Sequence, residues 1–147
     1  DKMDGAYDYD AVISVQWPFG YGLSYTTFKY DNFRTSASEF KAEDQITLSV
    51  DVTNTGAVTG KEAVMLFSRD MVASLTPENR RLRAFRKIEL KPGQTTTVSF
   101  TLKGSDLAFV GADGKWILEK GEFRMQAGNK TLNLHCSETH KWDTQNK

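Results

Sequence analysis

Residues 45–54, QITLSVDVTN, alternate strictly between apolar and polar side chains, and this alternation constrains the fold more than any other feature. Polar and charged residues occupy one parity, and the other consists of Ile46, Leu48, Val50 and Val52. A repeat of two is typical of a strand with one buried face, because successive side chains of a strand point to opposite sides. The apolar face of such a strand must be covered by a second layer.

Similar segments recur along the rest of the 147-residue chain. Turn chemistry separates them, most clearly at Pro92-Gly93 and Asp113-Gly114. We expect SDLAFV, residues 105–110, to form one helical turn with Ser105 as its cap. About seven strands with turns roughly every 8–12 residues, and no long amphipathic helix, predict an all-β, seven-stranded antiparallel sandwich. The eight segments from which this count of about seven strands is drawn are 27–33, 45–54, 60–70, 82–90, 95–102, 115–118, 122–128 and 131–136.

Two segments depart from simple alternation. Phe85 and Ile88 are both expected to point inward although they are three residues apart, which predicts a β-bulge near Arg86 and Lys87. The segment AVMLF, residues 63–67, is apolar on both faces. One parity would serve the core, and the other, which includes Met65 and Phe67, is expected to be covered by a partner or to form an exposed patch.

The first 26 residues differ in character from the remainder. They end in a stretch rich in aromatic residues and glycine, WPFGYGLSYT, which reads as an extended segment outside the sandwich. We therefore predict a lead-in or interdomain connector over residues 1–26, a sandwich over 27–137 and a tail over 138–147. Nothing resembling a signal segment opens the chain, so the mature protein lacks one or this is an internal piece.

Composition gives no support to several other classes of protein. Lysine plus arginine and aspartate plus glutamate each number 19, so no general field attracts nucleic acid or an anionic membrane. The longest apolar run, residues 63–67, is far shorter than the ~20 residues that a spanning helix needs. A single cysteine, Cys136, excludes an intramolecular disulfide and is expected to be a half-buried thiol on the last strand.

No motif indicates a metal, a cofactor or catalysis. Gly20 and Gly22 lack the third glycine and the helix of a phosphate loop. Neither the acidic lead-in nor the last histidines match an ordinary metal site; the residues considered were Asp4, Asp8, Asp10, His135, Cys136 and His140. Asn129-Lys130-Thr131 fits the glycosylation acceptor pattern. A basic run is expected to be a solvated edge or an interdomain contact; it comprises Arg80, Arg81, Arg83, Arg86 and Lys87.

Several motifs, in order, resemble one family. PFGYGLSYTTF, VDVTNTGAVTGKEAVMLF, LRAFRKIELKPGQTTTVSFTL, SDLAFV and WILEKGEFRMQAGN are similar to the C-terminal fibronectin type III-like domain of glycoside hydrolase family 3, the β-glucosidase and β-xylosidase group. The resemblance covers about Pro18 to Asn129 and implies an immunoglobulin-like sandwich. It also implies catalytic residues upstream, in a barrel and an α/β domain, so none is assigned to this chain.

The resemblance also implies partners and a location. In the family, the segment that begins at Pro18 connects the α/β layer to the sandwich. We therefore expect interdomain contacts at Trp17, Pro18, Phe19, Gly20, Tyr21, Gly22 and Tyr25, made with the barrel and α/β domains of the same parent chain. In an isolated fragment, a homodimer could cover these rings instead. The family implies a periplasmic or secreted protein, with the domain packing against the catalytic body and shaping the rim of the oligosaccharide site.

Two other functions remain open. A carbohydrate-binding module would present aromatic rings to sugars, and the candidate rings are Trp17, Trp116 and Trp142. A structural or adhesive sandwich unrelated to glycosidases would need no such rings.

Overall fold

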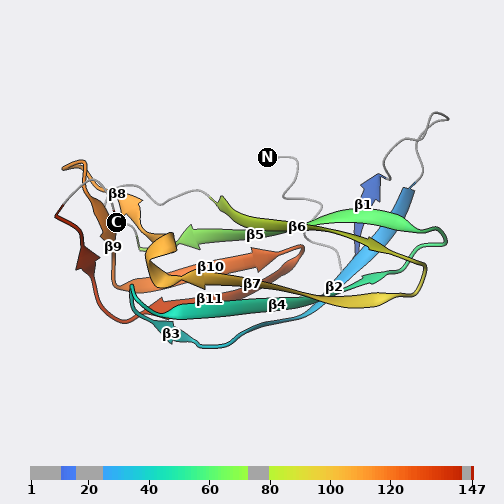
Figure 1. Ribbon diagram of the computed structural model, residues 1–147, viewed down its shortest axis with the longest axis horizontal. Coiled ribbons are helices and arrows are strands. Elements are labelled where there is room, and N and C mark those ends of the chain that lie inside the picture. The colour runs from blue at the N-terminus through green and yellow to red at the C-terminus, as the bar shows by residue number, and fades with distance from the viewer. Residues whose placement is uncertain (1–10, 16–24, 73–79, 144–146) are drawn as a thin grey trace.

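A computed structural model describes residues 11–15, 25–72, 80–143 and 147, and in this part the strands form two large sheets and one small sheet (Figure 1). The four-stranded sheet has the order β1 (Ala11–Val15), β2 (Tyr25–Thr35), β4 (Gln45–Asn54) and β7 (Thr95–Lys103). The five-stranded sheet has the order β3 (Glu39–Phe40), β11 (Lys130–Cys136), β10 (Gly121–Ala127), β5 (Gly60–Asp70) and β6 (Arg81–Leu90). The small sheet has the order β12 (His140–Lys141), β9 (Trp116–Leu118) and β8 (Phe109–Val110).

The predicted all-β fold is confirmed. β4 and β5 begin and end at the residues that the alternation indicated, and seven of the described strands are seven residues or longer. Neighbouring strands are antiparallel except for β3 and β11, which pair in parallel over two residues. β1 lies within the range assigned to the lead-in and pairs with β2, and β12 lies within the range assigned to the tail.

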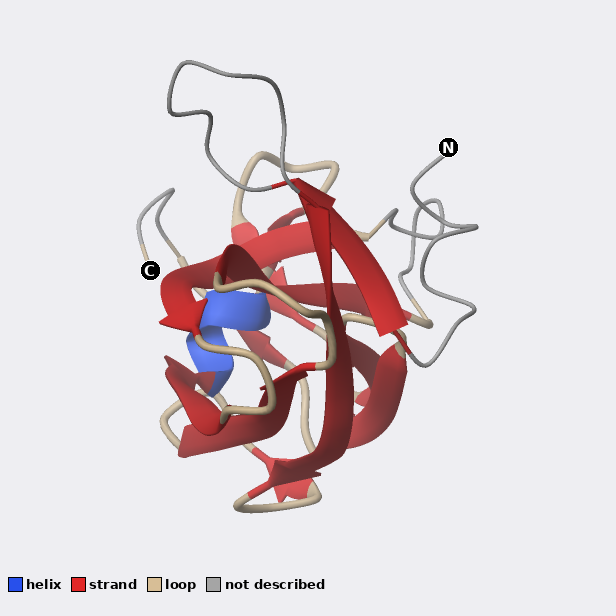
Figure 2. Ribbon diagram, turned by 90° about the vertical axis from the view of Figure 1, so that its right-hand side faces the viewer, coloured by secondary structure: helices blue, strands red, loops and turns tan. Residues whose placement is uncertain are grey.

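The core fills the space between the two large sheets, which wrap around the interior in the view along the strands (Figure 2). All four apolar residues of the alternating segment in β4 are fully buried. The facing residues come from three strands of the other sheet and are equally buried: Val64, Leu66, Phe123, Met125 and Leu134. Phe40 and Phe123 meet edge to face, with ring centroids 5.7 Å apart.

Asn54, at the end of β4, connects the two sheets by hydrogen bonds. Its side chain is fully buried, and its Nδ2 donates to the carbonyl oxygens of Val58 (2.8 Å) and Leu90 (2.9 Å). Its Oδ1 accepts from the Thr26 hydroxyl (2.8 Å) and from the backbone N–H of Gly56 (2.9 Å). A buried amide is tolerated because its donors and acceptors are satisfied in this way.

Two hairpins depend on glycine. The predicted Asp113-Gly114 turn joins β8 to β9, but the loop is longer than two residues: Gly114 N–H donates to Gly111 O, and Gly111 N–H donates to Lys115 O. Gly114, at φ +79°, occupies the left-handed position that follows such a turn. In the β10–β11 hairpin, Gly128 has φ +59° and lies against the ring of Tyr30, where a side chain would collide with it.

Two local predictions were wrong. Ser105 does not cap the turn that follows β7: the 3-10 helix η1 spans Gly104–Leu107, and the Asp106 carboxylate accepts from the Lys103 N–H at 2.9 Å instead. Phe85 does not point inward, since it is 59 % exposed. The bulge lies at Arg83, three residues before the predicted position, because the pairing of β6 with β5 shifts there.

Candidate interdomain interface

An apolar patch covers part of the outer surface of the five-stranded sheet, on the face turned away from the core. It comprises Ala63, Met65 and Phe67 of β5 and Leu82 and Phe85 of β6, and is called the β5–β6 patch below. Leu82 is 50 % exposed and Phe85 is 59 % exposed, whereas the three β5 residues are half-buried. The structure thus places this parity of β5 on the outward face, and β6 extends that apolar surface; that a partner covers Met65 and Phe67 stays a prediction.

The bulge at Arg83 is what brings the two β6 residues onto one face. Leu82 lies opposite Phe67, and Phe85 lies opposite Met65, although Leu82 and Phe85 are three apart in sequence. In a regular strand, residues three apart point to opposite sides, so the extra residue is required for this alignment. Inward, β6 contributes Ala84, Ile88 and Leu90 to the packing against the core.

Two arginines of the predicted basic run border the β5–β6 patch: Arg80 contacts a ring of the patch, and Arg83 donates hydrogen bonds to residues beside it. The guanidinium of Arg80 lies 4.3 Å from the centroid of the Phe67 ring. Arg83 donates from Nε to the Ser68 hydroxyl (2.7 Å) and from Nη1 to the Asp106 carbonyl oxygen (3.0 Å), which ties the bulge to η1. β6 is the edge of its sheet, where charged side chains hinder pairing with other chains.

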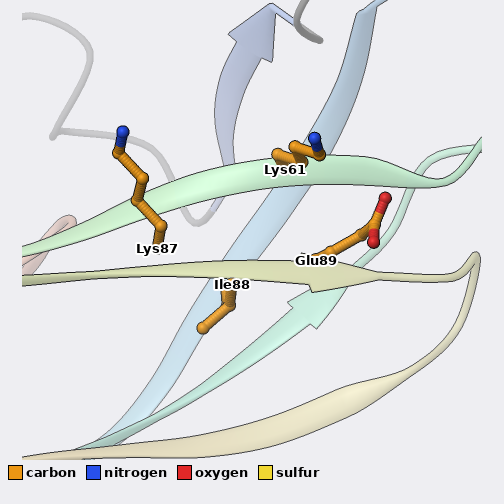
Figure 3. A pocket seen from close by; sticks show the side chains of 4 residues that line it. All are labelled: Lys61, Lys87, Ile88 and Glu89. Carbon is orange, nitrogen blue, oxygen red and sulfur yellow. The ribbon is translucent and has the colours of Figure 1, made fainter.

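A hollow of about 400 Å³ lies at one end of the patch, and Lys61, Lys87, Ile88 and Glu89 contribute to its lining (Figure 3). Lys61 of β5 lies opposite Glu89 of β6 in the strand register. Figure 3 shows Ile88 on the side of β6 opposite to Lys87. The hollow therefore reaches around the edge strand. Such a depression next to an apolar surface can accept a protruding side chain or loop of a neighbouring domain.

A smaller hollow of about 130 Å³ lies at the other end of the patch. The residues that contribute to its lining are Phe67, Arg69, Arg80, Arg124, Gln126 and Thr131. Arg69 of β5 and Arg124 of β10 lie directly opposite each other in the sheet. The two hollows and the β5–β6 patch thus form a continuous strip along β5, from Lys61 to Arg69.

Most of the other predicted contact residues lie outside the described part of the chain. Residues 17–22 are in this group, so their expected interdomain role stays a prediction. Tyr25 begins β2 and pairs with Val15, and its side chain is also outside the described part. Of the predicted site, the structure therefore places Met65 and Phe67, and it adds Leu82 and Phe85, which the sequence reasoning missed.

The described residues that were considered for a metal site make other contacts. Burial raises the pKa of the Cys136 thiol, which donates to the Glu138 carbonyl oxygen at 3.2 Å. His135 Nδ1 lies 2.9 Å from Glu122 Oε1. Within residues 11–15, 25–72, 80–143 and 147, no group of three or more His, Cys, Asp and Glu is placed to hold a metal, and no helix has the length and apolarity to cross a membrane.

The two described tryptophans pack against the core instead of standing free. Trp116 and Trp142 are both partly buried, and the ring of Trp142 meets His140 edge to face at 4.3 Å. The Lys147 ammonium lies 4.7 Å from the centroid of the Trp116 ring. Next to them, the Lys141 ammonium forms a 2.6 Å ion pair with Asp113, and this hydrogen bond lowers the pKa of the Asp113 carboxyl. This arrangement favours packing over a sugar-stacking platform.

Comparisons with known proteins agree with the fold and identify relatives of the chain. Residues 62–131 match the fibronectin type III-like domain. The chain is 37 % identical over 139 residues to a lysosomal β-glucosidase of Dictyostelium discoideum, covering 88 % of this chain and 17 % of that protein. It is 45 % identical over 112 residues to a β-xylosidase of Formosa agariphila, covering 76 % of this chain and 16 % of that protein.

A solved structure gives the same result in three dimensions. The chain is similar to part of a β-glucosidase from Erythrobacter marinus with a TM-score of 0.71 and 34 % sequence identity, covering 82 % of this chain and 17 % of that one. The chain thus spans about one sixth of the length of the relatives that it matches. Their catalytic domains lie outside the matched region.

Proposed function

We propose, from the premise that this chain carries the fibronectin type III-like domain found in the C-terminal region of family 3 β-glucosidases and β-xylosidases, that it is a non-catalytic accessory domain of such a glycoside hydrolase. Its role is to pack against the catalytic domains of a longer polypeptide and to shape the rim of their substrate site. The chemistry belongs to carboxylates elsewhere in that polypeptide.

The observation that carries this proposal is the outward apolar pairing of Met65 with Phe85 and of Phe67 with Leu82. In a free-standing sandwich, two half-exposed large apolar residues on an edge strand would favour association with other molecules. Covering the exposed half of Leu82 and Phe85 would contribute about 1–2 kcal/mol each. With the 400 Å³ hollow at one end, the β5–β6 patch suits a domain–domain contact in which side chains interlock.

The connector role of the first 26 residues is part of the same proposal. Strand β1 pairs with β2 in antiparallel orientation, and in the sequence the stretch WPFGYGLSY, residues 17–25, follows β1 and runs to the start of β2. Aromatic rings and glycines in that position would allow close packing against a neighbouring domain. The names of two relatives include a location, lysosomal for the β-glucosidase of Dictyostelium discoideum and periplasmic for that of Salmonella typhimurium, and these names support placing this chain outside the cytosol, in the periplasm or the secretory route.

Two measurements test the proposal. The coding sequence upstream of Asp1 should encode a barrel and an α/β domain in the same reading frame. That upstream portion, expressed separately, should bind this chain in isothermal titration calorimetry, and the double variant Leu82→Ser/Phe85→Ser should weaken binding by about 2–4 kcal/mol. Asn133→Ser, on the same sheet but outside the patch, serves as the control. An upstream region without glycosidase domains would disprove the proposal.

A further inference from the structure

Two arginines face each other across neighbouring strands on the outer surface of the five-stranded sheet. Arg69 of β5 and Arg124 of β10 are direct cross-strand partners. Like charges in that relationship destabilise a sheet, whereas opposite charges stabilise it. Within the described part of the chain, neither arginine has a carboxylate within ion-pair distance. The fold thus accepts an unfavourable charge pair that a bound anion would neutralise.

The two arginines share a hollow with a third. Arg80 joins them in the lining of the 130 Å³ hollow, and its guanidinium is held over the Phe67 ring at 4.3 Å. The described lining residues include three guanidinium groups and no carboxylate. The nearest acidic residue along β10 is Glu122, and His135 already engages it at 2.9 Å.

Neutral polar groups also belong to the described part of the lining. Gln126 donates from Nε2 to the Gly128 carbonyl oxygen at 3.0 Å, which holds its amide in place, and Thr131 is its cross-strand partner on β11. An amide and a hydroxyl beside guanidinium groups suit a solute that has both a charged group and neutral oxygens. The volume admits one such group or a single small ring, not an extended chain.

We propose that this hollow is a binding site for one oxyanion group, a carboxylate or a sulfate, of a small solute such as a sugar acid. Guanidinium groups bind planar carboxylates and tetrahedral sulfates through paired N–H donors, so Arg69 and Arg124 would bracket the anion. The inference does not depend on the proposed accessory function, because it concerns only side chains of this chain.

The test is a titration of the ¹⁵N-labelled chain followed by NMR. Sodium glucuronate and sodium sulfate are added separately, with glucose as the neutral comparison. We expect shifts confined to the amides and arginine side chains around residues 67–69, 80, 124–126 and 131. Arg124→Gln and, independently, Arg69→Gln should each weaken binding about tenfold or more, the effect of losing one charge-assisted interaction.

Arg86→Gln is the matched control, since it removes the same charge from β6 outside the hollow, and it should leave the affinity unchanged. Tighter binding of glucuronate than of sulfate would support a sugar acid as the ligand, and equal binding would support a free inorganic anion. No confined shifts with either salt, or shifts that survive both arginine variants, would overturn the proposal. Unchanged chemical-shift dispersion in each variant shows that the fold is intact.

Discussion

The side-chain amide of Asn54 donates a 2.9 Å hydrogen bond to the carbonyl oxygen of Leu90, and in doing so it joins the last residue of β4 in one sheet to the last residue of β6 in the other. The backbone of Asn54 continues the link, since it accepts from Gly93 N–H at 2.8 Å and donates to Gln94 O at 3.0 Å. One residue therefore fixes how the β6–β7 connection crosses from sheet to sheet.

Asn54→Ala should reduce the free energy of unfolding by about 2–4 kcal/mol, because it leaves buried partners such as the Leu90 carbonyl without their hydrogen bonds. Urea denaturation followed by tryptophan fluorescence measures the change. Asn133→Ala, at an exposed position of β11, should change it by less than about 0.5 kcal/mol. Equal effects of the two substitutions would contradict the cross-sheet role of Asn54.

Gly128→Ala and Gly93→Ala should lower the free energy of unfolding by different amounts, although both glycines have positive φ. At Gly128 an added Cβ would lie 2.5 Å from a Tyr30 ring atom, whereas at Gly93 nothing lies within 4 Å. Gly93→Ala should therefore cost about 1–2 kcal/mol, from backbone strain alone. Gly128→Ala should cost a further 1–3 kcal/mol from overpacking. Thermal unfolding by circular dichroism distinguishes them, and a smaller loss for Gly128→Ala would refute the contact.

Asp51 should make stability depend on pH in acid. A hydrogen bond from the Thr97 hydroxyl (2.8 Å), together with those from Asn32 and Arg34, lowers the pKa of Asp51 below 3.8 in the folded state. A carboxyl whose folded pKa is depressed contributes stability above its unfolded pKa, and loses it as pH falls through the folded pKa. The contribution is thus present above the unfolded pKa of 3.8 and is lost progressively as pH falls from there through the lower folded pKa.

Asp51→Asn should therefore lower the free energy of unfolding by about 1 kcal/mol or less at pH 7, since the site is partly solvated. At pH 2 the loss should be smaller still. Urea denaturation at both pH values tests this. Glu43→Gln, at an exposed carboxyl, is the comparison. A penalty for Asp51→Asn that grows towards low pH would have the wrong sign.

The Cys136 thiol should be inert in the folded protein. It is fully buried, and burial raises its pKa, so that the reactive thiolate is both scarce and inaccessible. Labelling with a chromogenic disulfide at pH 8 should be slower by at least about 100-fold in buffer than in denaturant, because it requires local opening. A Cys136→Ser/Asn133→Cys variant places the thiol on the exposed face and should react at once. Rapid labelling of the native protein would disprove the burial of Cys136.

Leu82→Ser and Phe85→Ser should leave the isolated chain as stable as the parent, within about 0.5 kcal/mol each, because both side chains are half-exposed. Phe123→Ala, in the core, should cost about 3–5 kcal/mol. Chemical denaturation of the three variants compares them. A large loss for either surface variant would mean that the β5–β6 patch supports the sandwich itself, and not a partner.

The alternation of apolar residues was sufficient to locate most strands, because the period of two is a local property of the chain. β4 and β5 begin and end where the pattern indicated, and all four apolar residues of 45–54 are buried. The outward apolar parity at Met65 and Phe67 was visible for the same reason. Turn residues such as Pro92 and Gly93 also acted locally, through their own backbone preferences.

Only the tertiary structure decided which residues meet across strands. In β6, every second residue before the buried Leu90 lies on the inward side: Ile88, Arg86 and Ala84. Phe85 therefore points outward. The charge of Arg86 made this alternation hard to recognise in the sequence. Arg86 is exposed because β6 is an edge strand, and edge position follows from pairing between distant segments. The bulge at Arg83, the Asn54 link between sheets and the meeting of Arg69 with Arg124 are set in the same way. Each depends on register between strands that lie far apart in the chain, which no local pattern of side chains specifies.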